Sequence, residues 1–265
     1  MGNLPGMAGS EEAREPEARE PEKPKPPTRL VLVRHGVTEH TGPILSGRMP
    51  GIDLSEKGAG QAEATAQRLA KLPVAAVYAS PIERTFQTAQ RIAAYHDTDV
   101  RPLPGVVEAD YGDWTGGKIA DLARTDEWKV VQVAPSRARF PNGESLREMQ
   151  ARTVAALDEL VARHAHETIV VVGHADPIKS AIAHYTGMHL DLFQRVHVAP
   201  ASVTIFDFHT YGATLVKCND TGGLDDLLPE PEAVSGATEE RSSLAGAASA
   251  REAAVPPSSE RDPEV

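Results

Sequence analysis

Leu30-Val31-Leu32-Val33-Arg34-His35-Gly36 is the stretch of this 265-residue chain with the plainest structural meaning. Its first four residues are an apolar run bounded by Arg29 and Arg34, which is typical of a strand buried on both faces. Val74–Tyr78 and Thr168–Val172 are runs of the same kind. The sequence therefore predicts three buried strands.

Amphipathic helices are expected between these strands. Apolar residues recur at spacings of three and four over Ala59–Leu69, Ile82–Ala93 and Leu146–Leu160. Two closing runs, Ser202–Phe208 and Thr214–Lys217, have the character of strands. Alternating strands and helices predict an α/β fold, a three-layer sandwich with a mostly parallel central sheet flanked by helices.

Polar residues mark where the helices are expected to begin. Their side-chain oxygens can accept hydrogen bonds from the free N–H groups of a first helical turn. The candidate caps are Ser55, then Ser80 with Pro81 behind it, then either Asn142 or Ser145, and finally Asp176 ahead of a helix that starts at Pro177. The alternative for Asp176 is that it faces the ligand.

The two ends of the chain differ from its middle in composition. Residues 1–28 are rich in Glu, Pro and Ala, and residues 223–265 carry ten acidic and three basic side chains. Such segments bury too little apolar surface to offset the entropy of ordering. We expect a disordered tail over 1–28, one domain over 29–222 and a disordered acidic tail over 223–265.

Charge and composition exclude several classes of protein. The net charge of −11 argues against a nucleic-acid partner, and no long uncharged apolar run predicts a membrane span. The acidic, proline-rich start differs from a secretory signal. The single Cys218 rules out an intramolecular disulfide and a multi-cysteine zinc site. We expect a cytoplasmic protein without membrane or nucleic-acid partners, and homo-oligomerisation stays open.

Two arginines and two histidines come just after predicted strands. Arg34 and His35 follow the first strand, Arg84 comes soon after the second, and His174 follows the third. The carboxyl ends of parallel strands meet at one edge of a sheet, so these side chains should lie together. Guanidinium groups match phosphate oxygens, and a neutral imidazole is a nucleophile toward phosphorus. Nearby cations help to keep the imidazole unprotonated.

Five blocks of sequence stand out in order from about residue 29 to residue 220. They are Leu32–Glu39, Gly47-Arg48 with Asp53–Gly58 and Gln61-Ala62, Ser80–Ala89, Glu108–Gly116, and Gly143–Ser145 with Val172–His174. With these blocks the chain resembles the histidine phosphatase superfamily, also called the phosphoglycerate mutase-like family. Within the family, Gly47–Gly51 resembles a stretch of bacterial proteins labelled probable phosphomutases.

The resemblance implies a role for five residues. His35 becomes phosphohistidine, and the phosphate pocket is lined by Arg34, Arg84 and His174. Glu108 protonates the departing oxygen and then activates water. The family implies no metal and no other cofactor, and the partner it implies is a small phosphorylated substrate.

Two further candidates rest on weaker signals. Thr41 stands where many family members have a phosphate-touching Asn, in a loop about three residues longer here. Arg48 is either a surface ion-pair partner or a ligand for a second acidic group of the substrate, and both readings stay open.

The sequence thus predicts a metal-independent phosphomonoesterase that acts through a covalent phosphohistidine on a small phosphorylated metabolite. Family mutases read Glu-Arg-His-Tyr-Gly at the acid block, whereas Glu108–Gly112 lacks the Arg-His pair, which favours phosphatase over mutase. The rivals are a phosphoglycerate mutase-type phosphotransferase, a non-catalytic phospholigand-binding protein and a two-metal phosphoesterase built on His174 and Asp176.

Overall fold

The computed structural model describes residue 2 and residues 25–223. These residues belong to one unit, Met1–Asp226, and a second unit, Leu227–Val265, lies wholly outside them. The predicted tails over 1–28 and 223–265 fall almost entirely outside the described residues and stay a prediction.

One mixed sheet runs through the described part of the chain. Its six strands are ordered β3-β2-β4-β1-β5-β6. The first four of these pair in parallel, while β5 is antiparallel to both β1 and β6. The strands are β1 (Thr28–Arg34), β2 (Val74–Ala79), β3 (Val100–Pro102), β4 (Thr168–Gly173), β5 (Val203–His209) and β6 (Gly212–Asp220).

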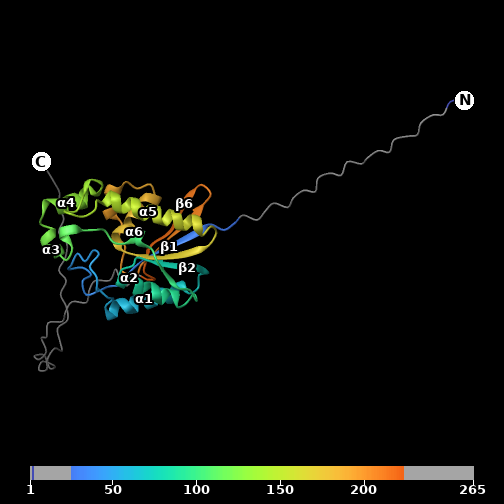
Figure 1. Cartoon of the computed structure of the whole chain (residues 1–265), viewed down its shortest axis with the longest axis horizontal. Coiled ribbons are helices and arrows are strands. Elements are labelled where there is room, and N and C mark those ends of the chain that lie inside the picture. The colour runs from blue at the N-terminus through green and yellow to red at the C-terminus, as the bar shows by residue number, and fades with distance from the viewer. Residues whose placement is uncertain (1, 3–24, 224–265) are drawn as a thin grey trace, which may run out of the picture. The chain divides into compact units, whose positions relative to one another are not determined.

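Helices cover both faces of this sheet (Figure 1). On one face α1 and α2 bury residues such as Leu69 and Ile92 against Val31 and Val170. The helices are α1 (Glu56–Leu69), α2 (Glu83–Ala93), α3 (Ile119–Leu122), α4 (Asp126–Val133), α5 (Leu146–Arg163) and α6 (Ala175–Tyr185).

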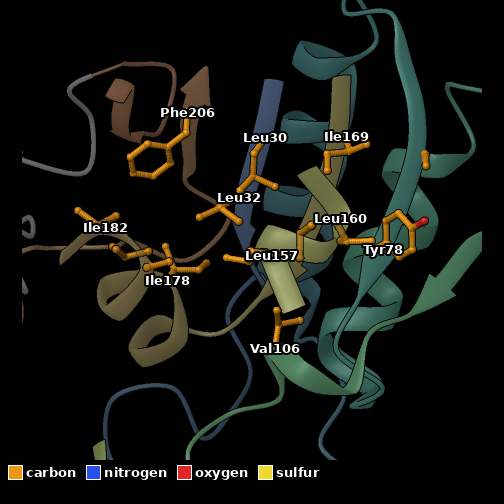
Figure 2. Packing of buried hydrophobic residues seen from close by; sticks show 14 residues of the cluster. Leu30, Leu32, Tyr78, Val106, Leu157, Leu160, Ile169, Ile178, Ile182 and Phe206 are labelled. Atoms are coloured by element: carbon orange, nitrogen blue, oxygen red, sulfur yellow. The ribbon is translucent and has the colours of Figure 1, made fainter. Parts of the chain in front are cut away.

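The opposite face of the sheet is covered by α5 and α6. Figure 2 shows Leu157 and Leu160 of α5 and Ile178 of α6 packed around Leu30 and Leu32 of β1. Alternate residues of β1 therefore enter the two cores, so both faces of this strand are buried. The predicted three-layer α/β sandwich is confirmed.

A third apolar cluster lies beside the sandwich and carries the short helices. Trp114 packs against Trp128 at 5.9 Å and against Phe140 at 5.5 Å between ring centroids. Val131 of α4 joins the same cluster. This cluster anchors α4 next to the loop that follows residue 106.

Two of the predicted caps are confirmed. The Ser55 side chain accepts from the backbone N–H of Gly58 at the start of α1. At the start of α5, Ser145 accepts from the N–H of Glu148, whose carboxylate accepts in return from the N–H of Ser145. Ser145 rather than Asn142 is therefore the cap, and it forms a capping box.

The other two predicted caps are wrong. Helix α2 begins at Glu83 behind Ile82, because Ser80 still donates its N–H to Val172 O at the end of the sheet. Helix α6 begins at Ala175 behind His174, which places Asp176 inside the first turn. The hydroxyl of Ser80 and the carboxylate of Asp176 are used elsewhere in the site.

No helix among the described residues combines the length and the apolar character needed to cross a membrane.

Candidate active site

The candidate residues gather at the carboxyl edge of the sheet. In the register of β1 with β4, Arg34 pairs with Gly173, so His35 and His174 follow at neighbouring strand ends. Arg84 lies in the first turn of α2, which follows β2. The structure thus brings the predicted arginines and histidines together, and His35, Arg84 and His174 are all buried.

His35 is held in one tautomer by its neighbours. Its Nδ1 lies 2.7 Å from Gly36 O, which can only accept, so Nδ1 carries the proton. Arg84 Nε–H donates to its Nε2 over 3.3 Å. Burial, then the charges of Arg84 and Arg34, lower the pKa of His35 well below its usual value. His35 is therefore neutral, with a lone pair on Nε2.

His174 shares the same guanidinium. Arg84 Nη2 donates to Nδ1 of His174 at 3.3 Å, while Nε2 of His174 lies 2.9 Å from Ser80 Oγ. The His35 and His174 rings meet edge to face at 5.3 Å between centroids. Burial, then the nearby His35 and Arg84, lower the pKa of His174 well below its usual value.

The two arginines keep donors for a ligand. Arg34 Nη1 donates to Val198 O at 2.7 Å, and Arg84 Nη2 donates to Gly47 O at 2.7 Å. Arg34 Nε and Arg84 Nη1 are buried without a hydrogen-bond partner among the described residues. Unpaired buried donors are costly, so a bound anion would stabilise both of them.

Glu108 is a buried carboxyl group in the same site. Its Oε1 accepts from the N–H of Ala109 at 2.9 Å. Burial, and then the negative charge of Asp176, raise the pKa of Glu108 to about 7, against the lowering effect of Arg84 and Arg34. A carboxyl group with this pKa is in part protonated at neutral pH and can act as a general acid.

These residues open into a cavity of about 360 Å³. Arg34, His35, Arg84 and Glu108 line its inner end. Its walls come from the loop after β1, from α4 and from the first turns of α6. The wall includes Thr38, Thr41, Tyr111, Trp128, Gln132, Asp176 and Lys179.

Thr41 lines the cavity as predicted, and its hydroxyl is already engaged. It accepts from the N–H of Thr38 at 2.9 Å and lies 3.1 Å from the Thr38 hydroxyl. This pair closes the turn after His35. A contact of Thr41 with phosphate stays a prediction.

Arg48 forms ion pairs beside the cavity. Its Nε donates to Glu108 O at 2.8 Å and its Nη2 to Glu144 at 2.9 Å. Arg48 is not among the residues that line the cavity. These contacts fit the ion-pair reading of Arg48, while a contact of Arg48 with substrate or phosphate stays a prediction.

The sequence reasoning misses the roles of Ser80 and Lys179, and it leaves open whether Asp176 caps a helix or faces the ligand. Ser80 holds His174, Asp176 accepts from the Tyr111 hydroxyl at 2.9 Å inside the cavity, and Lys179 lies 3.9 Å from Asp176. The available signal was spacing, because Asp176 and Lys179 follow His174 on one face of a helix. Among the described residues, no three His, Cys, Asp or Glu side chains gather in a way that could hold a metal ion.

Comparison with known proteins places this geometry in a family. The model of the histidine phosphatase superfamily, branch 1, matches residues 30–221. The chain belongs to this superfamily. The match covers all five residues of the inner site, and the resemblance seen in the sequence is confirmed.

Several of the named relatives are phosphatases, and one is a probable phosphoglycerate mutase of Proteus mirabilis, 28% identical over 75% of this chain and 96% of that protein. Phosphoserine phosphatase 1 of Hydrogenobacter thermophilus is 30% identical over 207 residues, which cover 76% of this chain and 97% of that protein. A phosphoserine phosphatase from Entamoeba histolytica, solved with 3-phosphoglyceric acid, is 28% identical with a TM-score of 0.68 and covers 74% and 98% of the two chains.

A mycobacterial glucosyl-3-phosphoglycerate phosphatase gives a TM-score of 0.67 at 25% identity over 73% of this chain and 99% of its own. With the family match, these relatives make the chain a phosphoric monoester hydrolase of the histidine phosphatase type.

Proposed function

We propose that this phosphatase hydrolyses the monoester of a small metabolite through a covalent phosphohistidine on His35, without a metal ion. One observation carries the proposal. The Arg84 guanidinium donates to Nε2 of His35 and to Nδ1 of His174, and it keeps one unpaired donor. A phosphate bound to that guanidinium lies next to the lone pair that attacks it.

In the first step, Nε2 of His35 bonds to phosphorus and the bond from phosphorus to the ester oxygen breaks. The carboxyl proton of Glu108 goes to that oxygen, and the alcohol departs. The charge that develops on the phosphoryl oxygens is stabilised by Arg34 and Arg84. Nδ1–H of His35 continues to donate to Gly36 O, which stabilises the phosphorylated ring.

In the second step, the Glu108 carboxylate takes a proton from water, and the water oxygen bonds to phosphorus. The bond between phosphorus and Nε2 breaks, and its electron pair returns to the His35 ring. Phosphate leaves, and Glu108 is protonated again.

Ser80 lets His174 assist in either tautomer. In the free protein Arg84 donates to Nδ1, so Nε2–H donates to the Ser80 hydroxyl. Once phosphate occupies the donors of Arg84, Nδ1 can carry the proton and donate to a phosphate oxygen. The Ser80 hydroxyl then donates to Nε2, because a hydroxyl both donates and accepts.

The outer part of the cavity favours a small, polar leaving group. Asp176, Lys179 and Gln132 offer charges and hydrogen bonds of both kinds, and Trp128 offers an apolar surface. The named relatives act on phosphoserine and glucosyl-3-phosphoglycerate, whose organic parts are polar. We place the substrate among such phosphorylated metabolites of the cytoplasm, and we place no nucleic acid among the partners.

The proposal is tested by measuring turnover of 4-nitrophenyl phosphate. The proteins compared are the wild type, His35→Ala and His209→Ala. His209 is exposed at the end of β5 and is the matched control. We expect His35→Ala to lose at least about 10⁴-fold in kcat, because no other group takes over a nucleophile's role. The wild type and the control should stay active in chelator.

Retained turnover in His35→Ala, or loss of wild-type turnover in chelator, would overturn the proposal. Transfer of phosphate between the hydroxyls of phosphoglycerate would instead make the protein a mutase. Binding of phosphate esters without turnover across a broad panel would make it a binding protein.

A further inference from the structure

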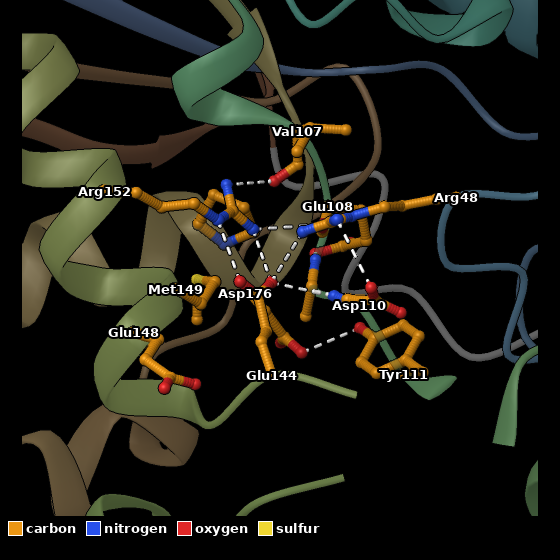
Figure 3. Close-up of polar contacts among 12 residues, drawn as sticks. Arg48, Val107, Glu108, Asp110, Tyr111, Glu144, Glu148, Met149, Arg152 and Asp176 are labelled. Atoms are coloured by element: carbon orange, nitrogen blue, oxygen red, sulfur yellow. Dashed lines mark hydrogen bonds and ion pairs between the residues drawn. The ribbon is translucent and has the colours of Figure 1, made fainter. Parts of the chain in front are cut away.

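A second arginine cluster lies behind the acid Glu108, outside the cavity. Arg152 projects from α5 toward the segment before Glu108, and all five N–H donors of its guanidinium are used (Figure 3). Its Nη1 donates to Gly105 O at 2.9 Å and Val107 O at 2.7 Å, and its Nη2 donates to Glu108 O at 3.1 Å. Arg152 therefore binds three carbonyl groups of this segment.

Glu144 completes the cluster from the loop before α5. It accepts from Nε of Arg152 at 3.0 Å and from Nη2 at 2.6 Å. Its Oε1 also accepts from the N–H of Asp110 at 2.8 Å, and Asp110 O accepts from the N–H of Glu144 at 3.0 Å. The backbone is thus held on both sides of Glu108.

The segment needs such support because it has little regular structure of its own. Residues 107–111 lie between two short 3₁₀ turns, Pro104–Val106 and Gly112–Trp114. Loops of this kind move more than the elements they connect unless side chains tie them down. Proton transfer requires a heavy-atom distance of about 2.6–3.2 Å, so a small displacement of Glu108 has a large effect on the rate.

We propose that Arg152 and Glu144 are positioning residues that hold the carboxyl group of Glu108 against the leaving-group oxygen. The inference rests on the proposed function, since it assumes that Glu108 is the general acid. It explains why both side chains of a partly buried ion pair also bind the backbone of a loop. Lysine cannot replace Arg152, because an ammonium group lacks the planar fork that reaches several acceptors at once.

The test compares a poor and a good leaving group. Glycerol phosphate needs a proton on its leaving oxygen, whereas 4-nitrophenyl phosphate needs it less. We expect Arg152→Lys and Glu144→Gln to lower kcat/KM on glycerol phosphate by about tenfold more than on 4-nitrophenyl phosphate, in the direction of Glu108→Ala. The matched control is Arg163→Lys, which changes an exposed arginine of the same helix.

A double variant separates positioning from a general loss of structure. If Arg152 acts through Glu108, then Arg152→Lys should change kcat/KM on glycerol phosphate little in a Glu108→Ala background. An equal loss on both substrates, or an undiminished loss in that background, would overturn the inference. Glu144→Gln keeps the shape of the side chain and serves as the second variant if Arg152→Lys folds poorly.

The outcomes also separate this inference from the proposed function. Turnover that survives His35→Ala contradicts the proposed function itself. If His35→Ala is inactive and Glu108→Ala shows the leaving-group effect, but Arg152→Lys and Glu144→Gln do not, only the positioning role is wrong.

Discussion

Burial and the charge of Arg84 together keep two histidines unprotonated, and burial is the larger cause. The buried guanidinium of Arg84 also donates to one nitrogen of each ring. Gly36 O and Ser80 Oγ then take up the second nitrogen of each ring. The nucleophile is thus prepared before substrate arrives, which avoids the cost of reorganisation during the reaction.

Asp176 is the residue whose charge should be visible in the pH dependence. Its negative charge helps to raise the pKa of Glu108, so its removal should lower that pKa. With Asp176→Asn, Glu108 loses its proton at lower pH, and the alkaline limb of kcat/KM on an alkyl phosphate should move to lower pH. The pH profile of this variant, measured beside the wild type, checks the prediction.

Tyr111→Phe is the matched control, because it removes the hydrogen bond to Asp176 and keeps the charge. An alkaline limb that stays in place or moves to higher pH in Asp176→Asn would show that Asp176 does not tune the acid.

The residues of the inner site can be predicted from the sequence, whereas the residues that hold them in place by hydrogen bonds cannot. Arg34, His35 and His174 follow strand ends, and Glu108 belongs to a recognisable block. The partners of these residues are remote in sequence. Ser80 looks like a helix cap because Pro81 follows it, yet its hydroxyl serves a histidine 94 positions away. Local patterns carry no information about such a contact.

At the scale of elements, the sequence predicts the helices whose apolar residues recur regularly, and it misses the short strands and helices that lack such a pattern. Helices α1, α2 and α5 have apolar stripes of three turns or more, which fix their place against the sheet. Strand β3 has three residues and ends in a proline, and α3 has four residues. Such short elements form because tertiary packing holds them, so their own sequence shows little.

The capping box of α5 makes a prediction at this scale. Ser145→Ala removes the acceptor for the N–H of Glu148, and the free energy of unfolding should fall by about 1 kcal/mol. Chemical denaturation followed by circular dichroism measures the change. Thr210→Ala is the control, because Thr210 is exposed and its hydroxyl makes no hydrogen bond within the described residues.

A loss in Ser145→Ala no larger than in Thr210→Ala would show that the capping box does not stabilise the helix. The same variant also tests the support of the segment that carries Glu108, because Ser145 directly follows Glu144, which binds that segment.

At the scale of the whole molecule, the strand order makes the site. β1 lies between β4 and β5 at the middle of the sheet, and β2 lies on the other side of β4. The ends of β1, β4 and β2 therefore stand side by side and deliver His35, His174 and Ser80. Composition and periodicity predict a parallel sheet but not this order, because pairing depends on contacts between distant segments.

The three apolar clusters hold the strands and loops that carry the residues of the inner site. Both cores fix β1 from its two faces, and the third cluster anchors the cavity wall at α4. The cavity wall can vary without change to the inner end, which is how one fold serves several metabolites.

The most direct measurement traps the protein during turnover of a phosphorylated substrate, quenches it in alkali and locates added phosphoryl groups by peptide mass. The account predicts one phosphoryl group on the peptide that contains His35, bound to the imidazole and absent from His35→Ala. A phosphoryl group on another residue, or steady turnover with none on His35 at any quench time, would contradict it.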